Sequence, residues 1–382
     1  MSGLSSPFRL AILGAVLATA VSLFPRSNSP SHCSFVDFQI SATAQNLVFS
    51  NPPDPNSADE AVAFMMTALA TGVPSTGSQE VGGSFNIHAV YCKPTKKVKK
   101  HADTLQLLVH GITYNSSMWE GWGFGDKYNW HAYASKEGYH TLAIDRLGHG
   151  LSTRNADPLN VVQGPMHVEI IHQLISIVRG NTTANLLGRG FSKVAYVGHS
   201  FGSAIGTQVL RVYPEDVDAA VLTGFSNFIN FPWVNQNFRW KSAAIHDPTR
   251  FSGIPYGYLT FPDEPLRTAI MYGGSFDRAI SAFDFAHTDV CTIGEVGSNP
   301  WLLQASSGHS TPVMTVTGPS DVVFCPPGKP ACEAALADTQ KVFPDSSHYE
   351  YYVPDDTGHD LTLHYSAPKT FKEVHKFLAK WL

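Results

Sequence analysis

The sequence has little that would place the protein in a membrane or on nucleic acid. Beyond residue 24 no unbroken apolar run approaches the roughly 18 residues that a membrane-spanning helix needs, which predicts a soluble mature chain. Positive charge is not in excess either, since 26 Lys and Arg stand against 31 Asp and Glu, for a net charge of -5. The one basic run, at 93–101, is predicted to be a solvated loop, so nucleic acid is not an expected partner.

Metal and nucleotide signatures are also missing. The His and Cys residues show none of the spacings of a zinc site, and the sequence has no glycine-rich nucleotide-binding loop. No internal repeat is visible. We therefore expect neither a metal nor an organic cofactor.

The first residues have the layout of a secretory signal. A lone positive charge at Arg9 precedes an apolar run at 10–24, which contains the small residues at 18–20. The run is too short to span a membrane readily. We predict a cleaved signal peptide at 1–24 and a secreted, extracellular protein, with a retained signal anchor as the alternative.

Cysteine is scarce, and secretion would favour the pairing of four of the five cysteines. Cys325 and Cys332 bracket a turn-rich loop and are the simplest pair. Cys33 and Cys92 lie in strand-like segments, 33–49 and 85–92, that could be antiparallel neighbours. Cys291 is then unpaired and buried, although the sequence also permits it to take one of these partners.

The most informative stretch is the pentapeptide GHSFG at 198–202. An apolar run at 193–197 precedes it, and a helical pattern at 203–213 follows, closed by Pro214. A strand, a sharp turn and a helix in this order present a serine nucleophile, and the glycines let the strand and helix close around a strained residue. Ser200 is the candidate nucleophile; the alternative is an ordinary serine in a glycine-rich loop.

A nucleophilic serine needs a general base that a carboxylate orients. Asp321 follows a strand-like run at 312–317, and His359 follows another at 349–353. Both are therefore expected on loops at the carboxyl ends of parallel strands, where open sheets place their sites. We assign His359 as the base and Asp321 as the acid that orients it.

Other residues near the histidine are weaker candidates. Asp355, Asp356 and Asp360 are expected to be solvated turn residues. His348 precedes a strand instead of following one. None of them fits the place of base or acid as well as His359 and Asp321.

Two backbone donors must stabilise the oxyanion of a tetrahedral intermediate. One is the N–H of Phe201, the residue after the nucleophile. The other is expected after the run at 105–109, where a His110-Gly111 step allows close approach to the nucleophile, and we assign the N–H of Ile112. His110 is expected to brace this loop and not to titrate in catalysis, since His359 already fills the role of base.

Two sequons are candidate glycosylation sites, at Asn115 and Asn181. Asn181 lies in a polar stretch. Asn115 lies so near Ile112 that a glycan there could obstruct the site.

Together these residues resemble α/β-hydrolases of the esterase, lipase and lactonase type, and the chain is similar to secreted fungal members. The resemblance spans most of the chain and rests on the His110-Gly111 step, the turn DRLGHG at 145–150, the pentapeptide around Ser200, Asp321 and Gly358-His359. In this family the turn at Asp145 is structural. Related epoxide hydrolases and haloalkane dehalogenases carry Asp at the nucleophile position, so Ser200 argues against both. The resemblance implies a fold and a reaction class, not a substrate.

The predicted architecture is an α/β-hydrolase fold with an inserted cap. Strand-like runs alternate with helical stretches such as 162–179 and 369–382, which predicts a mostly parallel sheet with helices on both faces. The alternation breaks at 225–301, a segment rich in aromatic residues and proline, which we assign to the cap. The core is then expected at 25–224, beginning with antiparallel strands, and at 302–382.

The aromatic residues of the cap suggest an apolar pocket above Ser200. Phe228, Trp233 and Trp240 are candidates to line it, although such residues also form a cap's own core. A pocket of this kind suits an apolar or aromatic group better than a sugar or phosphate. A short helical stretch at 58–70 carries no readable function.

The sequence therefore predicts a secreted serine hydrolase that cleaves a carboxylic ester or lactone of a small apolar or aromatic molecule through an acyl-enzyme on Ser200. If the cap excludes water, the acyl group could pass to a substrate hydroxyl, which would make the protein an acyltransferase or a lactone-forming cyclase of secondary metabolism. A lyase that uses His359 as a base is a further alternative. An inactive binding protein is disfavoured, because binding alone would not require Ser200, Asp321 and His359 together.

Overall fold

The computed structural model describes residues 32–382 of the chain. The predicted signal peptide at 1–24 lies outside these residues and stays a prediction. Within residues 32–382, no helix is both long enough and apolar enough to cross a membrane.

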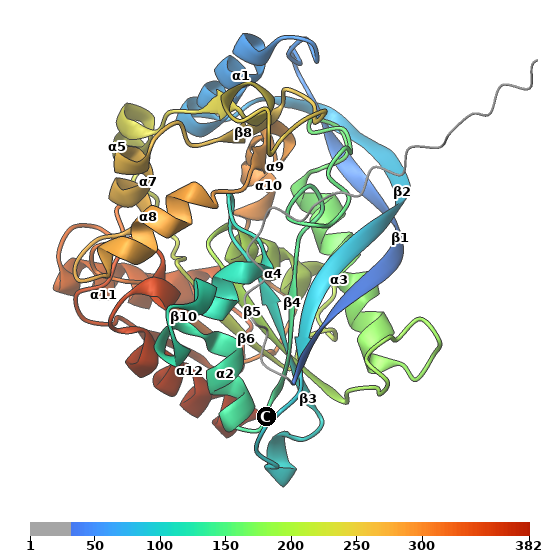
Figure 1. Ribbon diagram of the computed structural model, residues 1–382, viewed down its shortest axis with the longest axis vertical. Helices are drawn as coiled ribbons and strands as arrows, with labels where there is room; N and C mark the ends of the chain where they lie inside the picture. Colours follow the sequence, from blue (N-terminus) through green and yellow to red (C-terminus); the bar gives the residue numbers. More distant parts are fainter. Residues whose placement is uncertain (1–31) are drawn as a thin grey trace, which may run out of the picture.

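The centre of the structure is a sheet of eight strands: β1 (Cys33–Phe49), β2 (Ser75–Cys92), β3 (Thr104–Val109), β4 (His140–Ile144), β5 (Lys193–His199), β6 (Ala219–Thr223), β10 (Val313–Val316) and β11 (Tyr349–Tyr352). Their order across the sheet is β1-β2-β4-β3-β5-β6-β10-β11 (Figure 1). All pairs from β4 to β11 are parallel, whereas β1-β2 and β2-β4 are antiparallel. The prediction of a mostly parallel sheet is confirmed.

Four helices cover the two faces of this sheet: α2 (Trp130–Lys136), α3 (Gly164–Arg179), α4 (Phe201–Val212) and α12 (Ala367–Trp381). Neighbouring strand residues point to opposite faces, so Leu107 of β3 packs in the cluster that contains α3 and α4, and Leu108 packs in the cluster that contains α2 and α12. The helices predicted at 162–179 and 369–382 correspond to α3 and α12.

The strands β1 and β2 form a long antiparallel ribbon at one edge of the sheet. Cys33 lies opposite Cys92 in its register, and a disulfide joins them, as predicted. Buried and exposed residues alternate along much of β1, and α3 packs against this strand. The strand β2 begins at Ser75, well before the predicted run at 85–92. The prediction missed residues 75–84 because all but Val81 are polar or glycine, so the segment has no regular apolar alternation.

Between β6 and β10 the chain leaves the large sheet. It forms helices α5 (Phe231–Asn237), α6 (Ala243–His246), α7 (Glu264–Met271), α8 (Arg278–Ala286), α9 (Ile293–Gly297) and α10 (Asn299–Leu302), and a small antiparallel sheet of β7 (Lys241–Ser242), β8 (Tyr258–Thr260) and β9 (Cys291–Thr292). Figure 1 shows most of these yellow and orange elements gathered at one end of the molecule. The segment assigned to the cap, 225–301, lies within this stretch.

A second segment packs against the predicted cap. Helix α1 (Ala58–Thr71) lies between β1 and β2 in the chain and packs against α5, α9 and β7 (Figure 1). We call α1 together with the segment 225–301 the roof. The assignment of 225–301 to a cap stays a prediction, and the sequence contained no sign that α1 packs against this segment.

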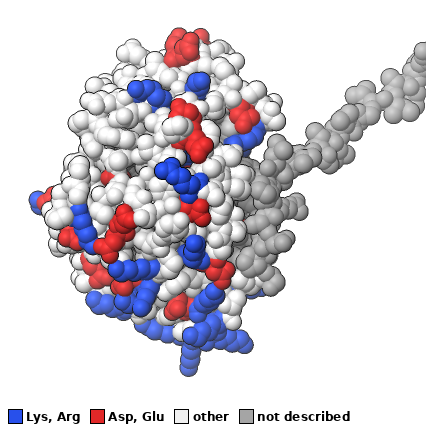
Figure 2. All heavy atoms as spheres, turned by 60° about the vertical axis from the view of Figure 1, so that its left-hand side comes forward, with Lys and Arg blue, Asp and Glu red and all other residues white. Residues whose placement is uncertain are grey.

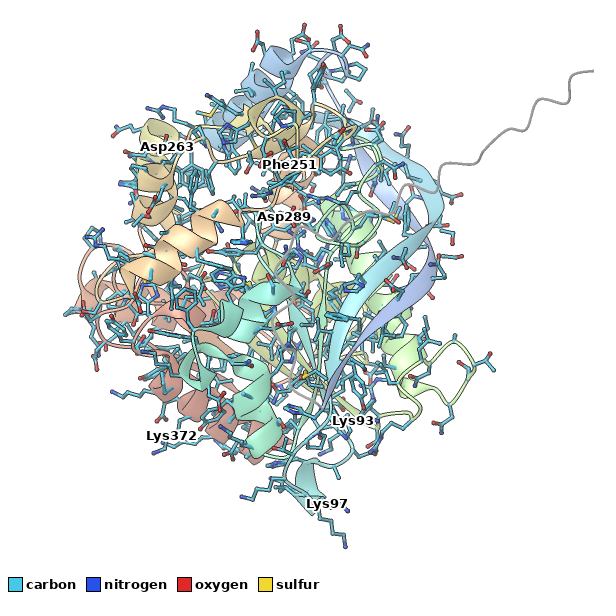
Figure 3. All side chains as sticks on the ribbon, in the orientation of Figure 1. Lys93, Lys97, Phe251, Asp263, Asp289 and Lys372 are labelled. Atoms are coloured by element: carbon cyan, nitrogen blue, oxygen red, sulfur yellow. A yellow bond between two sulfur atoms is a disulfide. The ribbon has the colours of Figure 1, made fainter. Side chains whose placement is uncertain are left out.

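The basic run at 93–101 lies at the end of the molecule away from the roof. Figure 2 shows Lys and Arg concentrated at this end, and Figure 3 places Lys93 and Lys97 there. The lysines of the run are exposed, as predicted, but His101 is buried and stacks on Tyr139 with ring centroids 4.1 Å apart. The remaining short elements are η1 (Lys99–His101), η2 (Ser116–Gly123), η3 (Asp126–Tyr128), α11 (Lys329–Asp338), η4 (Thr339–Val342) and η5 (Leu361–Leu363).

Candidate active site

Ser200 occupies a strained turn between β5 and α4. Its φ of 53° and ψ of -117° are uncommon for a residue with a side chain. The flanking glycines are required by close packing: a Cβ added to Gly202 would lie 2.2 Å from the carbonyl oxygen of Val109, and one added to Gly198 would lie 2.7 Å from that of Gly202. The turn therefore has the strand-turn-helix form that the pentapeptide predicts.

The structure brings Ser200, His359 and Asp321 into one hydrogen-bonded chain. Ser200 Oγ lies 2.9 Å from His359 Nε2, and His359 Nδ1 lies 2.7 Å from Asp321 Oδ2. All three residues are buried. With the proton on Nδ1 donated to Asp321, Nε2 is free to accept the serine proton, which is the arrangement that activates a serine.

Asp321 is held on the loop after β10 by backbone donors. The N–H groups of Val323 and Phe324 each donate to Asp321 Oδ1 over 2.9 Å, which leaves Oδ2 for His359. The ring of Phe324 stacks on the imidazole of His359, with centroids 5.7 Å apart and planes at 14°. The acid and the base therefore share one rigid support.

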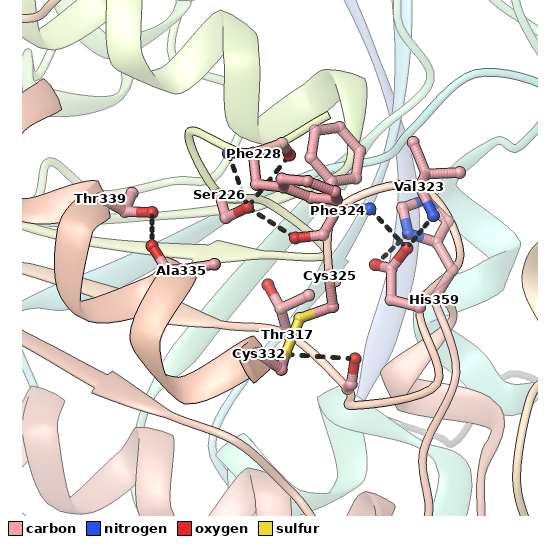
Figure 4. Close-up of a disulfide and its surroundings, with 12 residues drawn as sticks. Ser226, Phe228, Thr317, Val323, Phe324, Cys325, Cys332, Ala335, Thr339 and His359 are labelled. Atoms are coloured by element: carbon pink, nitrogen blue, oxygen red, sulfur yellow. Dashed lines mark hydrogen bonds and ion pairs between the residues drawn. A yellow bond between two sulfur atoms is a disulfide. The ribbon is translucent and has the colours of Figure 1, made fainter. Parts of the chain in front are cut away.

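A disulfide closes the acid loop. Cys325 is joined to Cys332 in α11, as predicted (Figure 4). The backbone N–H of Cys325 donates to the carbonyl of Asp321 over 3.1 Å. Ser226 donates from Oγ to the carbonyl of Phe324, at 2.6 Å. Cys291 is free and buried, also as predicted.

The environment of His359 raises its pKa. Burial by itself lowers the pKa of the imidazole, but the charge of Asp321, its hydrogen bond and the charge of Asp360 outweigh burial and raise the pKa above 6.5. Arg267 acts in the opposite direction, and His199 lies beside the ring, with centroids 5.0 Å apart.

Raising the pH through this pKa is expected to increase activity and decrease stability together. The base must be neutral, so the rate should rise with a midpoint above 6.5. Because the folded-state pKa exceeds the unfolded value, the stability that the charged imidazole contributes is full below about 6.5 and is lost as the pH rises through the folded pKa. NMR titration of the imidazole and thermal melts over about pH 5 to 9 check this. A midpoint below 6.5, or identical pH dependence of the melts for His359→Gln and wild type, would contradict it.

The predicted oxyanion loop lies against the nucleophile. A Cβ added to Gly111 would lie 3.0 Å from Ser200 Cβ and 3.2 Å from the carbonyl oxygen of His199, so a side chain here would force its neighbours to shift. Ile112 and Phe201 both line the cavity over Ser200. Among the hydrogen bonds within residues 32–382, none uses the backbone N–H of Ile112 or Phe201, so both donors are available to a ligand.

His110 has the geometry of a bracing residue. Its Nδ1 donates to the carbonyl of Gly111 over 2.7 Å, and its Nε2 accepts from the backbone N–H of Arg146 over 3.0 Å. Burial, followed by the charge of Arg146, holds its pKa well below 6.5. A neutral imidazole with both nitrogens engaged fits the predicted role in the loop.

A cavity of about 480 Å³ opens over Ser200 and His359. No Lys, Arg, Asp or Glu side chain of the described chain lines it. The lining includes the end of α1 from Ala68 to Gly72, as well as Phe231, Val234, Phe238, Phe261, Ile270, Met271 and Phe324. Both insertions of the roof therefore shape the cavity.

The three aromatic residues predicted to line the pocket do not line this cavity. On α5, Phe231 and Val234 share a face, which excludes Trp233. Trp240 is buried in the roof, where it stacks on Phe261 with centroids 4.6 Å apart. Phe228 is replaced in the lining by the next residue, Ile229.

The three aspartates near His359 were predicted to be solvated turn residues, and the prediction is wrong for one of them. Asp355 and Asp356 are exposed, as expected. Asp360 is not a solvated turn residue: it is fully buried, it accepts a hydrogen bond from Thr362 Oγ1 over 3.1 Å, and burial raises its pKa.

The asparagines of the two sequons differ in their exposure to solvent. Asn181 is exposed, so glycosylation there stays a prediction. Glycosylation at Asn115 is contradicted, because the residue is 7% exposed and its Nδ2, the atom that would carry the glycan, donates to Asp289 Oδ2 over 3.0 Å. The sequon is instead an N-cap, since Asn115 Oδ1 accepts from the N–H of Ser117.

Two buried arginines hold the loop at 110–114, and sequence reasoning missed their roles. Arg146 donates to backbone carbonyls of the loop, and Arg267 donates to Thr113 Oγ1 over 2.8 Å while it pairs with Asp284. Thr113 has a φ of 59°, so this part of the loop is strained. Arginine is seldom fully buried unless it is paired, and for Arg146 the only sequence signal was its place in the turn at 145–150.

The fold and the Ser200-His359-Asp321 geometry define a protein of the α/β-hydrolase type. A family model described as the alpha/beta hydrolase fold matches residues 107–361, which is more than half of the chain. The chain therefore belongs to the alpha/beta hydrolase fold family.

Solved structures agree on the fold. A soluble variant of monoglyceride lipase from Saccharomyces cerevisiae, in complex with a substrate analog, aligns with a TM-score of 0.54 at 14% identity, over 78% of this chain and 92% of that one. An epoxide hydrolase from Vigna radiata aligns with a TM-score of 0.51 at 14% identity, over 78% and 95%.

Curated relatives cover less of the chain. Norfluorocurarine synthase 1 from Strychnos nux-vomica is 27% identical over 174 residues, which are 44% of this chain and 56% of that protein. A protein of the same name from Strychnos sp is 26% identical over the same length. The chain thus spans about half the length of the curated relatives that it matches.

Proposed function

We propose that the protein is a serine hydrolase that cleaves a carboxylic ester or lactone of a small apolar or aromatic molecule. The observation that carries the proposal is the hydrogen-bonded chain from Ser200 through His359 to Asp321, with Ser200 open to an apolar cavity. The N–H groups of Ile112 and Phe201, which have no hydrogen-bond partner within residues 32–382, support it.

In the proposed acylation, Ser200 Oγ attacks the carbonyl carbon while His359 Nε2 takes its proton. The carbonyl oxygen becomes an oxyanion that accepts hydrogen bonds from the N–H groups of Ile112 and Phe201. The intermediate collapses as the bond from carbon to the leaving oxygen breaks, and His359 returns the proton to that oxygen. Ser200 is left as an acyl ester.

In the proposed deacylation, His359 removes a proton from water, and the hydroxide attacks the acyl carbon. The second tetrahedral intermediate expels Ser200 Oγ, which takes the proton back from His359. The products are a carboxylic acid and an alcohol, or one hydroxy acid from a lactone. Asp321 keeps the imidazole in the tautomer that both steps need.

The cavity favours a neutral, apolar substrate. Its lining within the described chain has no Lys, Arg, Asp or Glu to pair with a charged ligand, and burial of an unpaired charge is costly. Aromatic side chains such as Phe231, Phe238 and Phe261 offer faces for a ring or a hydrocarbon chain.

Filling the cavity from α1 is expected to change selectivity. Ala68→Phe should lower kcat/KM for bulky acyl esters by about tenfold and leave short acyl esters unaffected, because Ala68 lines the cavity. Ala63→Phe is the matched control, since Ala63 lies on the same helix but is exposed. Assays with a series of p-nitrophenyl esters measure the effect, and equal losses for short and long esters would contradict it.

An acyltransferase or lactone-forming cyclase with the same triad is the second candidate. The matched relatives are named as synthases, and transfer would compete with hydrolysis if the apolar cavity over Ser200 kept water from the acyl-enzyme. Labelling with a fluorophosphonate, followed by a screen of short and long acyl esters and lactones with and without added alcohols, tests both. Labelling of Ser200 with no hydrolysis but ester formation in alcohol would favour transfer, and absence of labelling would reject both.

We also propose that the protein is secreted. The apolar run at 10–24 and the two disulfides support this compartment. N-terminal sequencing of protein from the culture medium of a eukaryotic host tests it, and the same sample shows whether Asn181 carries a glycan.

A further inference from the structure

The guanidinium group of Arg146 donates hydrogen bonds to the backbone of the predicted oxyanion loop, residues 110–112. Arg146 follows β4 and is 1% exposed. Its Nε donates to the carbonyl of His110 over 3.0 Å, and its Nη2 donates to the carbonyl of Gly111 over 3.1 Å. One planar cation thus holds two successive carbonyls, a contact that the rigid fork of arginine allows.

The other side of this cation is held from the cap. Arg146 Nη1 forms an ion pair with Glu295 of α9, whose side chain is fully buried. Glu295 is itself fixed, because its Oε2 accepts from the backbone N–H of Thr292 over 2.8 Å in a capping box. His149 Nε2 lies 3.2 Å from Arg146 Nη2. The guanidinium therefore has one defined position.

The fixed position of the Arg146 guanidinium sets the direction of the N–H of Ile112, the predicted oxyanion donor, through the geometry of one peptide bond. The carbonyl of Gly111 and the N–H of Ile112 belong to one planar trans peptide, so they point in opposite directions. Two donors, Arg146 Nη2 and His110 Nδ1, hold the carbonyl. The N–H of Ile112 must then point away from Arg146, and it has no partner among the described residues. A cationic donor on the carbonyl also polarises the peptide and strengthens its N–H as a donor.

We propose that Arg146 is a positioning residue that orients and polarises the Gly111-Ile112 peptide for the oxyanion, and that Glu295 holds Arg146 in place from the cap. The inference rests on the proposed function, since it needs Ile112 to act as an oxyanion donor. It makes the oxyanion hole depend on a carboxylate far away in the sequence. The competing interpretation is a structural ion pair with no effect on the chemistry.

Two variants separate these interpretations. Arg146→Lys keeps a positive charge beside Glu295 but has no fork to hold both carbonyls. The double variant Arg146→Met with Glu295→Gln leaves no unpaired buried charge, which protects folding. Tyr258→Phe is the matched control. It removes a partly buried hydrogen bond, from Tyr258 Oη to the carbonyl of Ala156 at 2.8 Å, that does not involve the loop at 110–114.

The measurement is the second-order rate at which a fluorophosphonate labels Ser200, followed over pH with the melting temperature of each variant. The phosphoryl oxygen needs the same N–H donors as an ester carbonyl. Arg146→Lys should lower the limiting rate about tenfold and the double variant about thirtyfold, while the pH midpoint set by His359 stays that of wild type. Tyr258→Phe should melt at a similarly reduced temperature and react at the wild-type rate.

The outcomes are distinguishable. If wild type is not labelled at Ser200, the proposed function fails and this inference fails with it. If wild type is labelled and either variant reacts within twofold of it, the proposed function stands and the role of Arg146 is overturned. A slow reaction with a displaced pH midpoint would also overturn it, because the defect would then lie in His359 and Asp321.

Discussion

Replacing Ser200 by alanine is expected to abolish more than about 99.99% of turnover while the protein stays folded. The side chain is small, and its hydroxyl contacts His359 over 2.9 Å, so its loss removes the nucleophile and little packing. Steady-state hydrolysis of the best ester from the screen, with circular dichroism and melting of the same sample, provides the measurement.

Ser203→Ala is the matched control for this prediction. Ser203 is also buried, three residues along, and its Oγ donates to the carbonyl of Thr223 over 2.8 Å. This variant should lose some stability and keep most activity. Turnover by His359→Ala and Asp321→Asn should be reduced as severely as turnover by Ser200→Ala, since the three residues act as one unit. Turnover above about 1% in Ser200→Ala, or a covalent inhibitor on another residue, would remove Ser200 from its role.

Replacing both Cys325 and Cys332 by serine is expected to lower activity about a hundredfold and the melting temperature by only about 5 °C. In the chain-entropy model, the disulfide that closes so short a loop adds about 2.5 kcal/mol to the free energy of unfolding. The larger effect should fall on chemistry, because the loop carries Asp321, and a shift of about 1 Å in a positioned group costs on the order of a hundredfold in rate.

The other disulfide offers a control with the opposite balance. Cys33 and Cys92 are 59 residues apart in sequence and lie in the β1-β2 ribbon, away from Ser200. Serine at both positions should cost about 4 kcal/mol of stability and leave the rate constant unchanged. If the two double variants lost activity in proportion to their melting temperatures, the acid loop would have no special dependence on its disulfide. Peptide mapping without reductant should precede the kinetics. A disulfide between Cys325 and Cys291 would contradict the pairing on which this prediction depends.

The sequence was sufficient to locate the three residues that meet at the site, for physical reasons. A strained nucleophile needs glycines at fixed positions, and Gly198 and Gly202 have backbone atoms where a side chain would collide. Parallel strands end at one edge of the sheet, so residues that follow β10 and β11 are brought towards Ser200. The chain order of this fold, nucleophile then acid then histidine, together with these positions after strands, is what predicted Asp321 and His359.

The residues that line the cavity could not be found in the same way. Which face of α5 turns inward depends on how the whole helix packs, and this selects Phe231 and Val234 over the larger Trp233. Nothing local to α1 indicates that Ala68 would meet residues more than a hundred positions later. The pairing of Arg146 with Glu295 is hidden for a related reason, since each residue taken alone is expected at the surface.

The two insertions of the roof have a consequence for how this protein could diversify. None of the cavity residues from Ala68 to Gly72, nor those of α5, belongs to the hydrogen-bonded chain of Ser200, His359 and Asp321. If the proposed function holds, mutations in α1 and α5 can reshape the binding cavity and leave the Ser200-His359-Asp321 geometry unchanged. A combinatorial library confined to these two helices should yield variants with new substrate selectivities in which Ser200, His359 and Asp321 keep their geometry.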